Sequence, residues 1–91
     1  ENVYRLQIMN AAERHLNFEL QVDGLPGLKL VGESEVQVAA TESRWVSVRL
    51  QLPYDAAAAG SHPIHFRIAS RASDGQLVGQ LSEKTVFLVP R

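Results

Sequence analysis

The chain contains no cysteine, no block of basic residues and no long apolar run, and each absence excludes a class of function. Without cysteine, the 91 residues form no disulfide, no thiolate metal site and no cysteine-ligated iron–sulfur cluster. Nine basic residues oppose ten acidic ones. No run of basic residues provides the positive surface that a nucleic-acid backbone requires, so we expect no nucleic-acid partner. The longest apolar runs, at 56–59 and 86–89, are only four residues each, far short of the ~20 that span a membrane as a helix.

The length and the two ends of the chain bear on its domain organisation. No internal repeat, low-complexity linker or run of charge divides the 91 residues, and this length is typical of one domain. Glu1 is not an initiator methionine, and no secretory-type segment follows it. We therefore expect residues 1–91 to form a single domain excised from a longer protein.

What the chain does contain is a repeated alternation of apolar and polar residues. Residues 46–52 read Val-Ser-Val-Arg-Leu-Gln-Leu, and residues 64–68 read Ile-His-Phe-Arg-Ile. Successive side chains of a strand point to opposite faces of a sheet, so this pattern places one face on a core and the other in water. About seven such segments predict an all-β fold, a two-layer antiparallel β-sandwich. The expected strands are 3–9, 16–22, 28–31, 35–39, 44–52, 62–69 and 84–89, with a brief pairing at 77–78.

Turn residues separate these segments and predict how they connect. Residues 10–14 join the first two strands, which we expect to pair as a hairpin. Residues 23–27 (Asp-Gly-Leu-Pro-Gly) form a strong turn, because Gly allows a positive φ and Pro presets the first φ of the turn. Residues 73–76 (Ser-Asp-Gly-Gln) predict a hairpin with a type I′ turn. Four alanines at 56–59 are too few for an independent helix but long enough for one helical turn across the end of the sandwich.

The chain has three histidines, His15, His62 and His65, the residue type that offers an imidazole nitrogen to a metal or a proton. Residues three apart on a strand face opposite sides, so His62 and His65 cannot chelate one ion there. Met9 lies on the polar phase of its strand and offers a soft ligand for reduced copper. We predict no metal site, with a copper relay through His62, His65 or Met9 as the alternative. The favoured role of His62 is structural, a hydrogen bond back to the preceding connection as in a tyrosine corner.

No residue pattern in the chain predicts catalysis. Ser61 and His62 are adjacent only in sequence, which is not triad geometry, and the chain has no nucleophile elbow. Glu33 and Glu35 are the closest acidic pair, and solvation in a turn explains them. Residues 24–27 lack the helix start and the Lys-Ser/Thr of a phosphate loop. We therefore predict no catalytic and no cofactor-binding residue.

Trp45 is out of phase with its apolar neighbours, and three interpretations stay open. It caps the edge of the core at the start of its strand, or it is an exposed anchor for a partner protein, because Trp is enriched in binding hot spots. In the second case Arg44, Arg49 and Arg67 border the same patch. A position at a membrane interface is the third.

Four segments of the chain carry a family resemblance when they are taken in order. They are residues 2–10 (Asn-Val-Tyr-Arg-Leu-Gln-Ile-Met-Asn), 22–27 (Val-Asp-Gly-Leu-Pro-Gly), 60–66 (Gly-Ser-His-Pro-Ile-His-Phe) and 83–91 (Glu-Lys-Thr-Val-Phe-Leu-Val-Pro-Arg). Together they resemble the C-terminal immunoglobulin-like domain of the FixG/CcoG family of cytochrome oxidase accessory proteins. The resemblance implies an immunoglobulin-like sandwich of about seven strands. Two features of a true immunoglobulin are absent, namely the cysteine pair and a Trp on the third strand.

The resemblance also implies a cellular setting. Its parent is an inner-membrane protein with iron–sulfur clusters that assists assembly of the cbb-type cytochrome c oxidase by handling or reducing copper. The cluster cysteines belong to another part of the parent, so we expect no cofactor in this domain. The implied role is a non-catalytic module on the periplasmic side that docks an oxidase subunit, a copper chaperone or a second copy of itself. Apart from the resemblance, a generic adhesin or carbohydrate-associated sandwich is an alternative, which clustered exposed aromatic residues would support.

Overall fold

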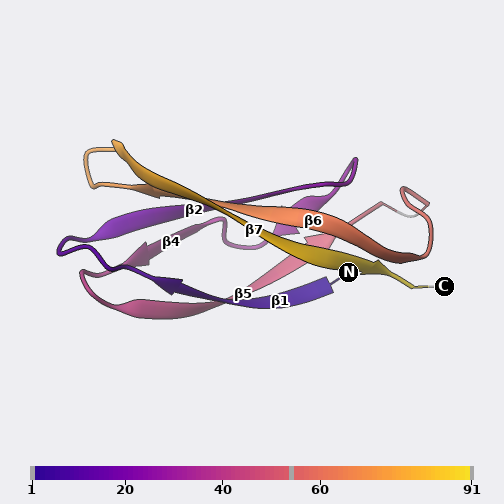
Figure 1. The fold of residues 1–91 in the computed structure, drawn as a ribbon, viewed down its shortest axis with the longest axis horizontal. Helices are drawn as coiled ribbons and strands as arrows, with labels where there is room; N and C mark the ends of the chain where they lie inside the picture. Colours follow the sequence, from indigo (N-terminus) through magenta and orange to yellow (C-terminus); the bar gives the residue numbers. More distant parts are fainter. Residues whose placement is uncertain (1, 54, 91) are drawn as a thin grey trace.

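A computed structural model describes residues 2–53 and 55–90 as two packed antiparallel sheets (Figure 1). The three-stranded sheet has the order β1–β5–β3, and the four-stranded sheet has the order β4–β2–β6–β7. The strands are β1 Asn2–Met9, β2 Leu16–Asp23, β3 Lys29–Val31, β4 Glu35–Val38, β5 Ser43–Gln51, β6 Gly60–Arg71 and β7 Leu77–Val89. The predicted all-β, two-layer sandwich of seven strands is confirmed. Glu1, Tyr54 and Arg91 lie outside the described residues, so the predicted connection at 53–59 and the segment 83–91 are described only in part.

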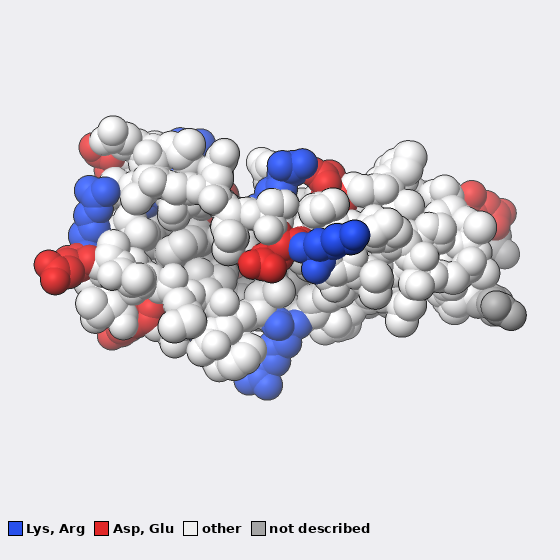
Figure 2. Space-filling model, in the orientation of Figure 1, with Lys and Arg blue, Asp and Glu red and all other residues white. Residues whose placement is uncertain are grey.

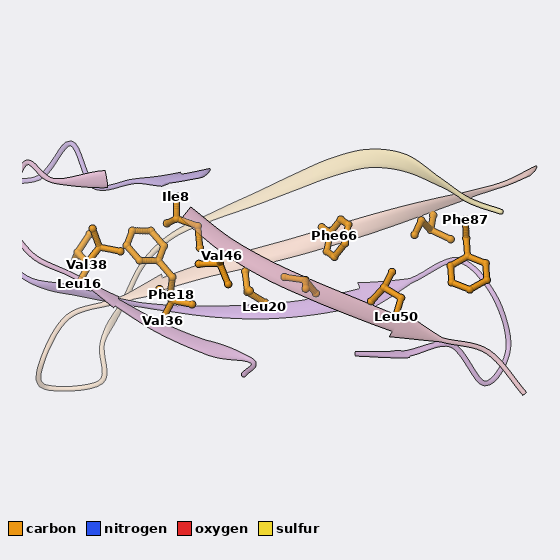
Figure 3. Packing of buried hydrophobic residues seen from close by; sticks show 12 residues of the cluster. Ile8, Leu16, Phe18, Leu20, Val36, Val38, Val46, Leu50, Phe66 and Phe87 are labelled. Carbon is orange, nitrogen blue, oxygen red and sulfur yellow. The ribbon is translucent and has the colours of Figure 1, made fainter. Parts of the chain in front are cut away.

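The core lies between the two sheets and is built from the alternating apolar residues of both (Figure 3). Leu50 of β5 and Ile64 of β6 are fully buried, each with 0% of its surface exposed. Tyr4 of β1 meets Phe66 of β6 edge to face, with 5.3 Å between ring centroids, which is a favourable geometry for an aromatic pair. The buried cluster is Ile8, Leu16, Phe18, Leu20, Val36, Val38, Val46, Val48, Leu50, Ile64, Phe66 and Phe87.

The predicted hairpin between the first two strands is wrong. β1 pairs with β5, whereas β2 pairs with β4 and β6, so the two strands lie in different sheets. The connection between them crosses from one sheet to the other. It is tied to the β4–β5 connection by two backbone hydrogen bonds, Asn10 N to Glu42 O at 2.9 Å and Thr41 N to Ala12 O at 3.0 Å. One apolar face per strand is required whether two strands pair side by side or face each other across a core, so alternation does not distinguish the two cases.

The β6–β7 hairpin is confirmed, but its turn is not type I′. Type I′ needs a positive φ at both central residues. Here Gly75 N donates to Ala72 O at 2.9 Å, which closes the turn. The two central residues have no positive φ, whereas Gly75, which follows them, has a φ of 88°. This is the arrangement of a three-residue loop with a Gly bulge. β7 is also one continuous strand from Leu77, which corrects the predicted start at Lys84, and it slips past β6 in register at Ser70/Arg71.

The expected helical turn at the four alanines is wrong. Ala56 N donates to Pro53 O at 3.1 Å, which closes a reverse turn, and no helix is assigned to residues 55–59. Nowhere in the described part of the chain is there a helix long and apolar enough to cross a membrane.

β1 and β7 are joined across the side of the sandwich at the end where both termini lie (Figure 1). The Asn2 side chain exchanges two hydrogen bonds with the Leu88 backbone, Nδ2 to O at 3.0 Å and N to Oδ1 at 3.2 Å. The Tyr4 hydroxyl donates to Val86 O at 2.6 Å. These bonds close the two edge strands over the core at this end.

Burial raises the pKa of the Tyr4 phenol above its ordinary value near 10. Because the folded pKa is the higher one, the proton stabilises the fold below pH 10, and this contribution is lost as the pH rises through the folded pKa. We expect the free energy of unfolding to fall more steeply above pH 10 in the native chain than in Tyr4→Phe. Denaturant unfolding from pH 8 to 11 measures this difference in free energy. Both proteins should also carry Tyr54→Phe, which removes the titration of the other tyrosine. Parallel curves for the two proteins would contradict it.

Candidate docking surface

The outer face of the β1–β5–β3 sheet displays an exposed tryptophan. Val46, Val48 and Leu50 of β5 point into the core, so the alternate residues Trp45, Ser47 and Arg49 point outward. Trp45 is 54% exposed. The pairing of β1 with β5 brings Gln7 opposite Trp45, Arg5 opposite Ser47 and Val3 opposite Arg49. We call the surface formed by Val3, Arg5, Met9, Trp45 and Arg49 the Trp45 face.

Arg5 and Trp45 form the centre of the Trp45 face. The Arg5 Cζ lies 4.7 Å from the centroid of the Trp45 ring, so the guanidinium stacks on the indole. A cation–π contact at an exposed site contributes about 0.5–1 kcal/mol. It holds both side chains in place and so reduces the side-chain entropy that a binding partner would have to remove.

The charge of the Trp45 face has one sign. β1, β3 and β5 contain no aspartate or glutamate, and their described basic residues include Arg5, Lys29 and Arg49. None of these three cations forms an ion pair within the described part of the chain. In the four-stranded sheet, Arg67 pairs with Asp23 and Arg71 with Glu19. The two outer faces therefore differ, because on the four-stranded sheet both arginines are paired with carboxylates, whereas the strands of the Trp45 face contain no carboxylate to pair with their cations.

The location of Trp45 in the structure distinguishes between the interpretations given from the sequence. Trp45 does not cap the core, because more than half of its surface is exposed on the outer face. Arg49 shares that face, as predicted. Arg44 does not, because it has the phase of the core residues and donates through Nη1 to Gln37 O at 3.4 Å. Arg67 lies on the other sheet. Arg5 was not among the residues predicted for this surface. The alternation predicts that its side chain points outward, but the pairing of β1 with β5 could not be predicted.

The histidines and Met9 are not brought together. The predicted structural role of His62 is confirmed, because its Nε2 lies 2.7 Å from Ala58 O and donates to that carbonyl, holding the preceding connection. His65 lies on the opposite face of β6, with Nδ1 3.9 Å from Asp23 Oδ1. Met9 lies at the end of β1 beside Ile68 and Ser70, far along β6 from His62, and His15 is exposed in a connection. Within residues 2–53 and 55–90, no three His, Asp or Glu side chains gather as a metal site.

The residues weighed for catalysis are likewise separate. Ser61 is exposed on β6, and the His62 ring that follows it is engaged with Ala58 rather than with the serine hydroxyl. Glu33 lies in the connection before β4 and Glu35 is its first residue, and both are exposed. The feature best suited to a function is therefore the Trp45 face, whose chemistry is recognition.

Comparison with known proteins gives one match. A family model described as "IG-like fold at C-terminal of FixG, putative oxidoreductase" matches residues 1–90. No curated protein and no solved structure gives a match. The family match covers nearly the whole chain and agrees with the two-sheet architecture described above.

Proposed function

Since the chain belongs to the family of immunoglobulin-like domains found at the C-terminus of FixG, we propose that it is a non-catalytic module that docks a protein partner. A fold by itself does not imply a function, so the argument rests on a surface. The observation that carries the proposal is the exposed Trp45 with Arg5 stacked on it, on a sheet face without carboxylates.

The composition of the Trp45 face supports docking. Trp and Arg are the residues most enriched in binding hot spots, and Met is enriched in protein interfaces generally. Val3 and Met9 add exposed apolar area on the same strand as Arg5. Unpaired cations on a face without acidic residues favour a partner surface that carries carboxylates.

The proposal includes a setting. The parent is a membrane-bound iron–sulfur protein that assists assembly of cbb-type cytochrome c oxidase, and the module lies on its periplasmic side. Its redox chemistry belongs to the part of the parent that holds the clusters. The partner is an oxidase subunit, a copper chaperone or a second copy of the module. Among these, the Trp45 face selects the one that presents an acidic surface.

Trp45 is the only tryptophan of the chain, so its fluorescence reports on this face alone. We expect the purified acidic partner to shift the Trp45 emission to shorter wavelength in a saturable titration. Trp45→Ala, measured by calorimetry, is expected to weaken binding at least about 30-fold, the loss that corresponds to a hot spot. Arg5→Glu is expected to weaken it about tenfold, with the largest effect at low salt.

Leu88→Ala is the matched control, because Leu88 is an equally exposed apolar residue on the other sheet and its truncation should leave binding unchanged. Equal affinities of native chain, Trp45→Ala and Arg5→Glu for the partner would refute docking through this face. An emission shift caused by anionic phospholipid vesicles, with no shift caused by proteins, would replace protein docking by membrane contact.

A further inference from the structure

The free edge of β7 carries unpaired backbone groups. β7 is the last strand of its sheet, with β6 on one side only. Val86 O and the backbone N and O of Leu88 point away from β6, because they bond to Tyr4 and Asn2 of β1. Backbone groups of an antiparallel strand alternate in direction, so Gln80, Ser82 and Lys84 present their N–H and C=O groups to the same free edge. Unpaired edges of this kind accept an added strand.

One end of this edge shows how an added strand would be held. The Asn2 amide donates to Leu88 O and accepts from Leu88 N, which is the exchange that a neighbouring backbone makes with an edge residue. At residues 80–84 no such partner is found among the described residues. The edge is therefore competent to pair and is occupied only near residues 86–88.

An apolar groove lies beside the open part of the edge. β1 and β7 converge near the termini and diverge toward the other end (Figure 1), and Figure 2 shows the molecule hollowed between them left of its centre. The groove holds about 240 Å³, and its lining includes the buried Ile8 and Phe18, the partly buried Ile68 and the exposed Met9 and Leu81. Leu81 has the inward phase of Phe87, yet 55% of its surface is exposed, against 2% for Phe87.

The charge beside the groove defines the occupant further. Glu83 also has the inward phase but is exposed, and it has no ion pair with a described residue. A strand added to this edge places side chains opposite Leu81 and Glu83. An antiparallel second copy of β7 supplies no cation there, because Lys84, the only basic residue of β7, has the opposite phase.

We infer that the β7 edge at residues 80–84 binds an extended segment of another polypeptide by strand addition. The segment places a large apolar side chain in the groove beside Leu81 and a lysine or arginine beside Glu83. This site uses the side of the sandwich between β1 and β7 and shares only Met9 with the Trp45 face, so it does not depend on docking through Arg5 and Trp45.

The probe is the capped peptide Thr-Lys-Thr-Leu-Thr-Lys-Thr, whose sequence reads the same in both directions and therefore fits either strand orientation. Titration of the labelled chain, followed by amide hydrogen exchange, is expected to slow exchange at Gln80, Ser82 and Lys84 about tenfold or more. The amides of Leu81 and Glu83 already face β6 and should change little. Ser82→Pro removes one edge donor without removing a β6 bond and is expected to weaken binding about tenfold. Ser82→Ala keeps the donor and should bind as the native chain does.

Two further variants keep the test decisive if Ser82→Pro fails to fold. The peptide N-methylated at leucine and at the two threonines that flank it loses its central edge-facing N–H groups in either strand orientation, so it should not bind the native chain. Trp45→Ala should bind the unmodified peptide normally. Equal binding of the methylated peptide, or no protection of the three edge amides at millimolar peptide, overturns the inference. Self-association of the chain that blocks the peptide also overturns it in favour of a second copy.

Discussion

At pH 7, Asn10→Asp is expected to lower the free energy of unfolding by about 3–5 kcal/mol, which is typical of an uncompensated buried charge. Asn10 is only 2% exposed. Its Nδ2 donates to three carbonyl oxygens, of Arg14 at 2.9 Å, Val38 at 3.0 Å and Ala39 at 3.2 Å. A carboxylate has no hydrogen to donate, so it would face these oxygens with negative charge. Since small domains have a total stability of about 5–15 kcal/mol, denaturant unfolding should show a large loss.

Asn10→Ala is the control, because it removes the donor without adding charge, and it should cost about 1–3 kcal/mol. The pH separates the two variants. Burial among carbonyl oxygens raises the pKa of the introduced carboxyl above its unfolded value near 4. The proton therefore favours the folded state, and the loss in Asn10→Asp should shrink as the pH falls toward 4. A loss of equal size in both variants that does not change between pH 4 and 7 would show that the charge is irrelevant.

The strands and their buried faces could be predicted because alternation is a local signal. Val46, Val48 and Leu50 are all buried, and the polar residues between them, Ser47 and Arg49, are exposed. The role of His62 was readable for the same reason, since its carbonyl partner lies four residues before it. Such features depend on phase and short spacing, which the sequence contains directly.

Strand pairing could not be predicted, because it depends on which apolar faces meet across the core. β1 was expected beside β2 but pairs with β5, a partner more than 30 residues away. The contact of Arg5 with Trp45 and the closure of β7 by Tyr4 both follow from that pairing. The candidate sites therefore depend on strand pairing, which the sequence does not predict. The direction of each of their side chains, inward or outward, could be predicted from the alternation. Asn10 was interpreted only as a turn residue. Two of its three carbonyl partners lie at the end of β4, far from it in the sequence, so its buried role could not be predicted.

The turn at residues 23–27 was readable from its Gly and Pro, but the close packing of Gly24 was not. Gly24 has a φ of +127°, which residues with a side chain rarely adopt. A Cβ at this position would lie 2.8 Å from Ile64 Cα and 2.9 Å from Pro63 O. Both are backbone atoms of β6, and Ile64 is fully buried, so neither can move aside cheaply. Gly24→Ala is therefore expected to lower the free energy of unfolding by about 3–5 kcal/mol, from backbone strain and overpacking together.

Gly60→Ala separates these two causes, because Gly60 has nearly the same φ, +124°, and nothing within 4 Å of a built Cβ. It should show the strain alone, about 1–3 kcal/mol. The difference between the two variants in denaturant unfolding then measures the clash with β6. Equal losses would mean that β6 yields to the added methyl group. A larger loss in Gly24→Ala would mean that the β2–β3 turn packs rigidly on β6, beside His62, whose ring anchors the other connection at this end of the sandwich.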